Sequence, residues 1–384
     1  MSIRLLSTSD WHLQERAWRR HPDLAGDAVF SLKQIVDRAV EEKVDAVIGA
    51  GDLIDTVDPT PSIQVQAHEQ FDRLQEAGIP FYFIQGQHER NAVRARFDAH
   101  PWPRHFHRRL VTIGGLKMYG LDWQASHQLL TELEEAADLQ IGLFVCHQVW
   151  GGPDFMGTLP GVEGQLEDCP APVVLTGDLH QHKTVKLKRE DGSTLRVFSP
   201  GSTCMQSIDE PPEKAFWELE FNRNKLVDYK SVKLITRPFH TFSLDDIGGL
   251  DDLCEDAKEG NFYDDDIPEV VRTPIIHVDY PDNLPDVYDR LMTAFDNQAH
   301  VFLSPRPTGS KVVRIEKTKD RVGQRTSLLS FLERATPKGS DEYRLCRRLL
   351  EIAESKNAVL DELKKIQTEV ITTVDEEEEE DDES

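Results

Sequence analysis

The feature that most constrains the fold is a β-α-β-α-β alternation over the first 86 residues, with Asp and His placed where strands end. Residues 3–10, 45–52 and 80–86 are apolar, β-rich runs, which predicts strands. Residues 27–43 carry apolar side chains at helical spacing, and a second helix is predicted at 62–77. This order is typical of an α/β protein, in which helices cover a mainly parallel sheet.

The strand pattern continues beyond this first unit. Strands are predicted at residues 117–123, 141–147 and 172–178, and a hairpin with an Asp-Gly turn at 184–199. An alternating run at 215–221 closes the segment. The carboxyl ends of strands in α/β sheets converge on one crevice, so polar residues at those ends are candidate site residues.

The net charge is unevenly distributed. With 44 basic and 69 acidic residues the formal charge is −25, but the nine residues 375–383 are all acidic and leave −16 on the remainder. Between Arg90 and Arg109 the sign reverses, with six arginines and one acidic residue. This segment predicts contact with nucleic-acid phosphates, led by Arg90 and Arg94, with an irregular solvated loop as the alternative.

Composition excludes several classes of protein. The chain is 39% hydrophobic and 29% charged, as globular proteins are. No apolar run approaches the roughly 20 residues that a membrane span needs, and the N-terminal segment does not resemble a signal peptide. The five cysteines are scattered and form no C-x-x-C motif, which argues against disulfides or a thiolate zinc site. We therefore expect a cytoplasmic protein without membrane association.

Five short polar elements carry the chemistry. Each alone is common in turns, but together they predict a site of imidazole and carboxylate groups that suits Mn²⁺, Fe²⁺ or Zn²⁺. Two such ions about 3.5–4 Å apart can polarise a phosphoryl oxygen and activate water. Asp52 is the expected bridge, because its strand lies between those of the other ligands. The residues in these elements are Asp10, His12, Asp52, Gln87, His88, His147, Asp178, His180 and His182.

These motifs resemble those of the calcineurin-like metallophosphoesterases and, within them, the SbcD-type (Mre-type) exonucleases of double-strand-break repair, in bacterial or phage form. The stretches that carry the resemblance are SDWHL, VDAVIGAGDLID, PFYFIQGQHE, CHQ, TGDLH, FSPGS and EKAFWELE. The resemblance implies an α/β fold, a four-layer α/β/β/α metallophosphoesterase sandwich, over residues 1–236. It also implies a two-metal DNA nuclease, with 3′→5′ exonuclease activity on duplexes and endonuclease activity on single strands.

The rest of the chain is interpreted through the same resemblance. Residues 237–306 are expected to form a small α+β capping domain that binds DNA. Residues 307–372 are expected to be a linker and helices that dock onto an SMC-like ATPase of SbcC or Rad type, although a heptad-like stripe there could instead pack on the chain's own core. Residues 373–384 are expected to be a disordered acidic tail. The implied partners are DNA ends and the ATPase, with the chain as a homodimer within a heterotetramer.

The resemblance implies metal-binding roles for individual residues. Asp10 and His12 would bind the first ion and Asp52 would bridge. The second ion would take Gln87, His147 and the first polar residue of the final motif. Two divalent ions are implied, with Mn²⁺ expected and Mg²⁺ or Fe²⁺ as alternatives. His88 would be the catalytic residue that binds no metal, contacting the scissile phosphate or protonating the leaving oxygen.

Two positions depart from the family pattern. Gln87 stands where the family has Asn, which moves the amide oxygen by one methylene. The family ends in G-H-x-H, whereas this chain reads G-D-L-H-Q-H. Aligning on the glycine makes Asp178 and His180 the ligands and leaves His182 as a surface or phosphate-contacting residue. Sliding by two residues would use His180 and His182; we prefer the first alignment because the preceding strand sets the register.

Two rival functions remain at this point. One is a metallophosphoesterase that acts on small phosphodiesters or a phosphoprotein, against which the capping segment and the arginine-rich segment argue. The other is a non-catalytic subunit that binds DNA ends and whose site has decayed. Gln87 is the sequence feature that supports decay, and the otherwise intact set of ligands opposes it.

Overall fold

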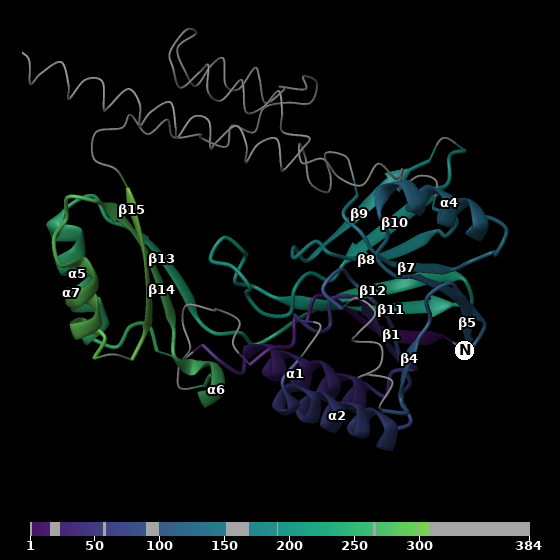
Figure 1. Cartoon of the computed structure of the whole chain (residues 1–384), viewed down its shortest axis with the longest axis horizontal. Coiled ribbons are helices and arrows are strands. Elements are labelled where there is room, and N and C mark those ends of the chain that lie inside the picture. The colour runs from purple at the N-terminus through teal and green to yellow at the C-terminus, as the bar shows by residue number, and fades with distance from the viewer. Residues whose placement is uncertain are drawn as a thin grey trace, which may run out of the picture. The chain divides into compact units, whose positions relative to one another are not determined.

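A computed structural model describes most of the first 306 residues (Figure 1). The described residues are 2–15, 24–56, 59–89, 100–150, 169–189, 191–263, 266–296 and 298–306. The predictions for Arg90, Arg94, the helices at 307–372 and the acidic tail lie outside this part of the chain. No helix among the described residues is long and apolar enough to cross a membrane.

The first six-stranded sheet has the order β12-β11-β1-β2-β3-β4. Strands β1 to β4 are parallel neighbours, whereas β11 pairs antiparallel with both β1 and β12. The bounds are β1 Ile3–Thr8, β2 Ala46–Ala50, β3 Phe81–Ile84, β4 Pro103–His105, β11 Ala215–Asn222 and β12 Lys225–Lys233. The parallel part of the sheet therefore comes from the alternation at the start of the chain.

The second six-stranded sheet has the order β5-β6-β7-β8-β10-β9. Its inner strands β6, β7, β8 and β10 are parallel, and an antiparallel strand lies at each edge. The bounds are β5 Arg109–Ile113, β6 Leu116–Leu121, β7 Leu143–His147, β8 Val173–Gly177, β9 Lys183–Lys188 and β10 Thr194–Ser199. The predicted hairpin is the β9–β10 pair.

The two sheets pack face to face and helices cover their outer faces (Figure 1). Side chains from both sheets, such as Leu5, Ile48, Val145 and Phe198, form one buried cluster between them. Helices α1 (Asp27–Glu42) and α2 (Pro61–Glu76) bury their apolar faces on the first sheet, and α4 (Ser126–Ala136) covers the second. The expected four-layer α/β/β/α sandwich is confirmed.

The sequence explains why α1 and α2 form where they do. In α1 the buried residues Leu32, Ile35, Val36 and Ala39 recur at helical spacing and face the sheet. Helix α2 begins at Pro61, which suits the first helical position because its missing N–H would have no partner there. The hydroxyl of Thr60 caps the same end by accepting from the Ile63 N–H.

Residues 239–306 contain a third, three-stranded parallel sheet of order β13-β14-β15. Two helices, α5 and α7, share a buried apolar cluster with it. The bounds are β13 Phe239–Ser243, α5 Ile247–Lys258, α6 Glu269–Arg272, β14 Ile275–Pro281, α7 Val287–Ala294 and β15 His300–Arg306. These residues contain both strands and helices, and their role as a capping domain that binds DNA stays a prediction.

Sequence patterns did not predict β4, β5, β12, β13, α4, α5 or α6. Strand β12 has nine residues of which seven are exposed, so its pattern is mostly polar. It forms because β11 supplies hydrogen bonds along its whole length. Strand β4 has three residues, too few to show a period of two.

Candidate metal centre

The candidate site lies at the carboxyl ends of strands from both sheets of the sandwich. Asp10 and Asp52 each come two residues after β1 and β2 end, and His147 is the last residue of β7. Backbone hydrogen bonds tie the first two loops together, from Asp10 N–H to Gly51 O at 3.0 Å and from His12 N–H to Asp52 O at 3.0 Å. The fold thus brings together polar residues that are far apart in the sequence.

Four of the predicted site residues have an unusual backbone conformation. The φ angles are 49° at Asp10, 43° at His12, 49° at Asp52 and 73° at Asp178. Residues other than glycine are uncommon in this left-handed region, and such conformations concentrate at functional sites. The strand-end loops therefore turn sharply enough to direct successive side chains into one place.

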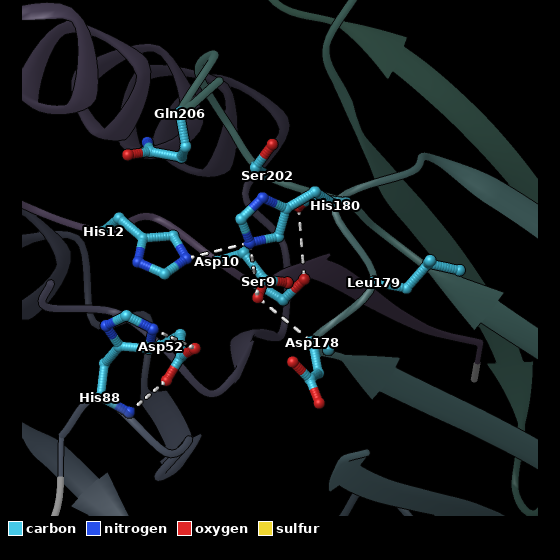
Figure 2. Close-up of polar contacts among 12 residues, drawn as sticks. Ser9, Asp10, His12, Asp52, His88, Asp178, Leu179, His180, Ser202 and Gln206 are labelled. Carbon is cyan, nitrogen blue, oxygen red and sulfur yellow. Dashed lines mark hydrogen bonds and ion pairs between the residues drawn. The ribbon is translucent and has the colours of Figure 1, made fainter. Parts of the chain in front are cut away.

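Asp10, His12 and His180 form the first cluster able to hold a cation. Figure 2 shows the His12 and His180 rings meeting at their edges, nitrogen toward nitrogen. Their Nε2 atoms are 3.1 Å apart, and His180 Nε2 lies 3.8 Å from Asp10 Oδ1. The other ring nitrogens contact carboxylates, because His12 Nδ1 lies 3.2 Å from Asp55 Oδ1 and His180 Nδ1 lies 2.7 Å from Glu210 Oε1. Both rings therefore direct Nε2 at a common point, as ligands of one ion do.

Asp10, Asp52 and His147 form a second, buried cluster. His147 Nδ1 donates to Ala50 O at 2.7 Å, and its Nε2 lies 3.2 Å from Asp52 Oδ2. Burial opposes both charges, but the Asp52 charge raises the pKa of His147 and the His147 charge lowers the pKa of Asp52. Asp10 belongs to both clusters, and the bridging role expected of Asp52 stays a prediction.

Gln87 and Asp178 complete the set of predicted ligands. The Gln87 side-chain N–H donates to Asp178 Oδ1 at 2.8 Å, and the Asp178 backbone N–H donates to Asp10 Oδ1 at 3.2 Å. Among the described residues, Asp10 Oδ2 and Gln87 Oε1 are buried without a hydrogen-bond partner, and buried His147 Nε2 has the ion-pair contact with Asp52. Buried atoms of this kind normally have a partner. An imidazole nitrogen, a carboxylate oxygen and an amide oxygen together fit a divalent cation.

His88 lies at the rim of the site and is more exposed than the residues around it. Its side chain is 41% exposed, its Nδ1 lies 3.0 Å from Asp55 O, and its Nε2 lies 3.9 Å from Asp52 Oδ2. Its backbone N–H donates to Asp52 Oδ1 at 3.0 Å, which Figure 2 shows. The ring can thus meet a ligand that approaches from solvent.

His182 takes no part in either cluster. Its Nδ1 lies 2.9 Å from Pro200 O, its Nε2 lies 2.8 Å from Ser231 Oγ, and its ring stacks on Trp217. These contacts favour a structural role for His182 over the phosphate contact expected from sequence. They also favour the alignment in which Asp178 and His180 are the ligands.

Glu89 supports the site, and sequence reasoning did not single it out. Its carboxylate is fully buried and accepts from the N–H groups of Leu53 at 2.7 Å and Gly86 at 2.9 Å. It therefore connects the loop after β2 to the loop after β3. Burial raises the pKa of this carboxyl to about 8, although the two N–H groups act in the opposite direction. The sequence feature that pointed to Glu89 was its place in the G-Q-H-E motif, directly after Gln87 and His88.

Two of the three described arginines of the predicted phosphate-binding segment, Arg104 and Arg108, have partners inside the protein, whereas Arg109 is exposed. The Arg104 guanidinium lies 5.6 Å from the ring centroids of both Tyr82 and Trp102. Arg108 forms a bidentate ion pair with Glu132, whose side chain is 4% exposed. These contacts favour structural roles for both arginines.

Comparison with known proteins agrees with this geometry. The family model described as calcineurin-like phosphoesterase matches residues 3–182, which span β1 to the end of the G-D-L-H-Q-H motif. This chain contains a calcineurin-like phosphoesterase domain. The matched residues include the two clusters that share Asp10 and a third group able to hold a cation, His12, Asp55 and His88.

Relatives of the phosphoesterase domain include proteins named for DNA repair. The chain is 27% identical to DNA double-strand break repair protein Mre11 of Methanosarcina mazei over 56% of this chain and 35% of that protein. It is 28% identical to the uncharacterized metallophosphoesterase YhaO of Bacillus subtilis over 54% of this chain and 52% of that protein. It is 23% identical to DNA double-strand break repair protein Mre11 of Saccharolobus solfataricus over 95% of this chain and 98% of that protein. The chain thus covers a third to a half of the first two relatives.

Proposed function

We propose that this chain is a two-metal-dependent phosphodiesterase that cleaves DNA at or near double-stranded ends. The observation that carries the proposal is the pair of clusters that share Asp10, one with His12 and His180 and one with Asp52 and His147. A pair of divalent cations, when bound, supplies Lewis acidity and lowers the pKa of water. The likeness to a double-strand break repair protein over 95% of this chain supports DNA as the substrate.

The residues take distinct roles in this proposal. Asp10, His12 and His180 hold one cation, and Asp52, His147 and the Gln87 oxygen hold the other with help from Asp178. His88 meets the substrate, because its ring is exposed and its Nδ1 contacts the Asp55 carbonyl oxygen at 3.0 Å. With Nδ1 used in that way, Nε2 is the atom that contacts the scissile phosphate or gives a proton to the leaving oxygen.

The finer parts of the proposal rest on the resemblance in sequence. They are 3′→5′ exonuclease activity on duplex DNA, endonuclease activity on single strands, Mn²⁺ as the preferred ion, and a cytoplasmic location. The proposed assembly is a homodimer bound to an SMC-like ATPase through residues 307–372. Arg90 and Arg94, which directly follow the G-Q-H-E motif, remain the proposed phosphate contacts.

The test is degradation of end-labelled linear duplex DNA by the purified chain with Mn²⁺, beside His88→Ala. We expect the wild type to shorten the duplex and His88→Ala to lose about 10²–10⁴-fold in rate, as removal of a general acid does. His68→Ala is the matched control, because His68 lies on α2, outside both clusters. It should leave the rate unchanged.

Two results would change the proposal. Cleavage of a small chromogenic diester without cleavage of DNA would favour a small-molecule phosphodiesterase. Absence of both activities, with or without an SMC-like ATPase, would favour a non-catalytic subunit. Metal binding by His88→Ala should equal that of the wild type, because the proposal gives His88 no ligand role.

A further inference from the structure

A buried polar group behind the first cluster connects it to the segment after β10. Glu210 contacts His180 Nδ1 through Oε1 at 2.7 Å, and its Oε2 lies 2.6 Å from Lys214 Nζ and 2.9 Å from Ser202 Oγ. Lys214 Nζ also donates to Ser202 Oγ at 2.8 Å. The side chains of Lys214 and Glu210 are 2% and 11% exposed. Both carboxylate oxygens of Glu210 therefore have polar partners inside the protein.

The arrangement determines which nitrogen of His180 faces the cluster. A hydrogen bond from Nδ1–H to a carboxylate fixes the tautomer, so the lone pair is on Nε2. That Nε2 is the atom 3.1 Å from His12 Nε2 and 3.8 Å from Asp10 Oδ1. A carboxylate behind the ring also raises the basicity of the ligand nitrogen.

Lys214 is the cationic partner of Glu210. Its Nζ lies 2.6 Å from Glu210 Oε2, and its side chain is 2% exposed. A buried ammonium is costly without a partner, so Lys214 and Glu210 stabilise each other, and Lys214 orients the carboxylate. Its direct contacts are with Glu210 and Ser202 and not with the cluster itself.

We propose that Glu210, held by Lys214 and Ser202, is a positioning residue that sets the cation affinity of the Asp10–His12–His180 cluster. This inference rests on the proposed two-metal function of the same site. It adds that the two clusters respond differently to a change at residue 210. His180 belongs to one cluster only, whereas Asp52 and His147 belong to the other.

The test is a Mn²⁺ titration of the chelator-treated full chain, followed by electron paramagnetic resonance of the unbound ion. Glu210→Gln keeps an oxygen for His180 but removes the charge. We expect one of two binding events to weaken about 10–100-fold, as loss of such an outer partner does in other metal sites, and the other to stay unchanged. Glu213→Gln is the matched control, because Glu213 is nearby and its side chain is 82% exposed.

A second variant covers the case in which Glu210→Gln leaves Lys214 unpaired and prevents folding. Glu210→Gln with Lys214→Met removes both charges of the buried pair, and thermal unfolding in chelator shows whether the chain is folded. The same selective weakening is expected of this folded double variant. A wild-type titration curve for either folded variant would overturn the inference.

The titration separates this inference from the proposed function. A wild type that binds two Mn²⁺ ions but leaves DNA intact contradicts the nuclease proposal alone, and the effect of Glu210→Gln still decides the role of Glu210. A wild type that cleaves DNA, together with a folded Glu210→Gln variant of unchanged affinity, contradicts the positioning role alone.

Discussion

At the scale of single residues, the histidines of the site are oriented before any cation arrives. His12, His147 and His180 each use Nδ1 to contact an oxygen of the protein and direct Nε2 inward. Fixing the ring in this way lowers the entropy that binding must remove, which is why such outer contacts affect metal affinity. The sharp turns at Asp10 and Asp52 have the same effect, because they set the direction of the carboxylates.

Gly86 gives a direct test of this tight packing. A Cβ at residue 86 would lie 2.0 Å from Asp52 Oδ1 and 2.7 Å from the Asp52 backbone nitrogen. We expect Gly86→Ala to displace the Asp52 carboxylate, weaken Mn²⁺ binding, and lower stability by about 1–3 kcal/mol, as overpacking does. Isothermal titration with Mn²⁺ and thermal unfolding would measure both effects.

Gly249→Ala is the control for that substitution. Gly249 lies in α5, where a Cβ would meet its first neighbour at an ordinary 3.6 Å. It should bind Mn²⁺ as the wild type does. Equal Mn²⁺ affinity in Gly86→Ala would mean that the position of Asp52 does not control binding.

At the scale of elements, the part of the site carried by strand ends could be predicted from sequence. An apolar run that ends in Gly-Asp or Cys-His predicts both a strand and a polar side chain at its carboxyl end, as at Asp52 and His147. Glu210 could not be predicted in this way. It lies in an irregular segment 30 residues after His180, and only tertiary packing brings the two together. The short or polar strands β4 and β12 were missed for the related reason that their hydrogen-bonded neighbours stabilise them.

Arg237 joins α1 to the segment that precedes β14. Its guanidinium contacts both carboxylate oxygens of Asp27 at 2.9 and 2.8 Å and the carbonyl of Thr273 at 2.9 Å, and its side chain is 6% exposed. We expect Arg237→Met to lower the free energy of unfolding by about 3–5 kcal/mol. The substitution leaves the Asp27 carboxylate, which is 13% exposed, without its cationic partner. Denaturant unfolding would measure this.

The matched control for Arg237→Met is Arg4→Met. The Arg4 and Glu42 side chains are 46% and 35% exposed and lie 3.3 Å apart. Exposed pairs of this kind contribute about 0–1 kcal/mol. If the two variants lost the same stability, the link between Arg237 and Asp27 would have no special role.

At the scale of the whole molecule, the sandwich itself assembles the site. Asp10 and Asp52 come from the first sheet, whereas His147 and the final motif come from the second. The buried cluster between the sheets, with residues such as Ile84 and Leu175, packs the two sheets together and so keeps their ligand-bearing strand ends close. Because neither sheet carries a full set of ligands, cation binding reports on the folded sandwich as a whole.

The most direct test of the central claim is the number of Mn²⁺ ions bound per chain at equilibrium dialysis. We expect about two ions for the wild type, since two clusters share Asp10. Asp10→Asn should weaken both, whereas Asp245→Asn should change neither, because the Asp245 side chain is 91% exposed and lies in the segment after β13. A wild-type chain that binds no ion or only one would contradict the two-metal site and the function built on it.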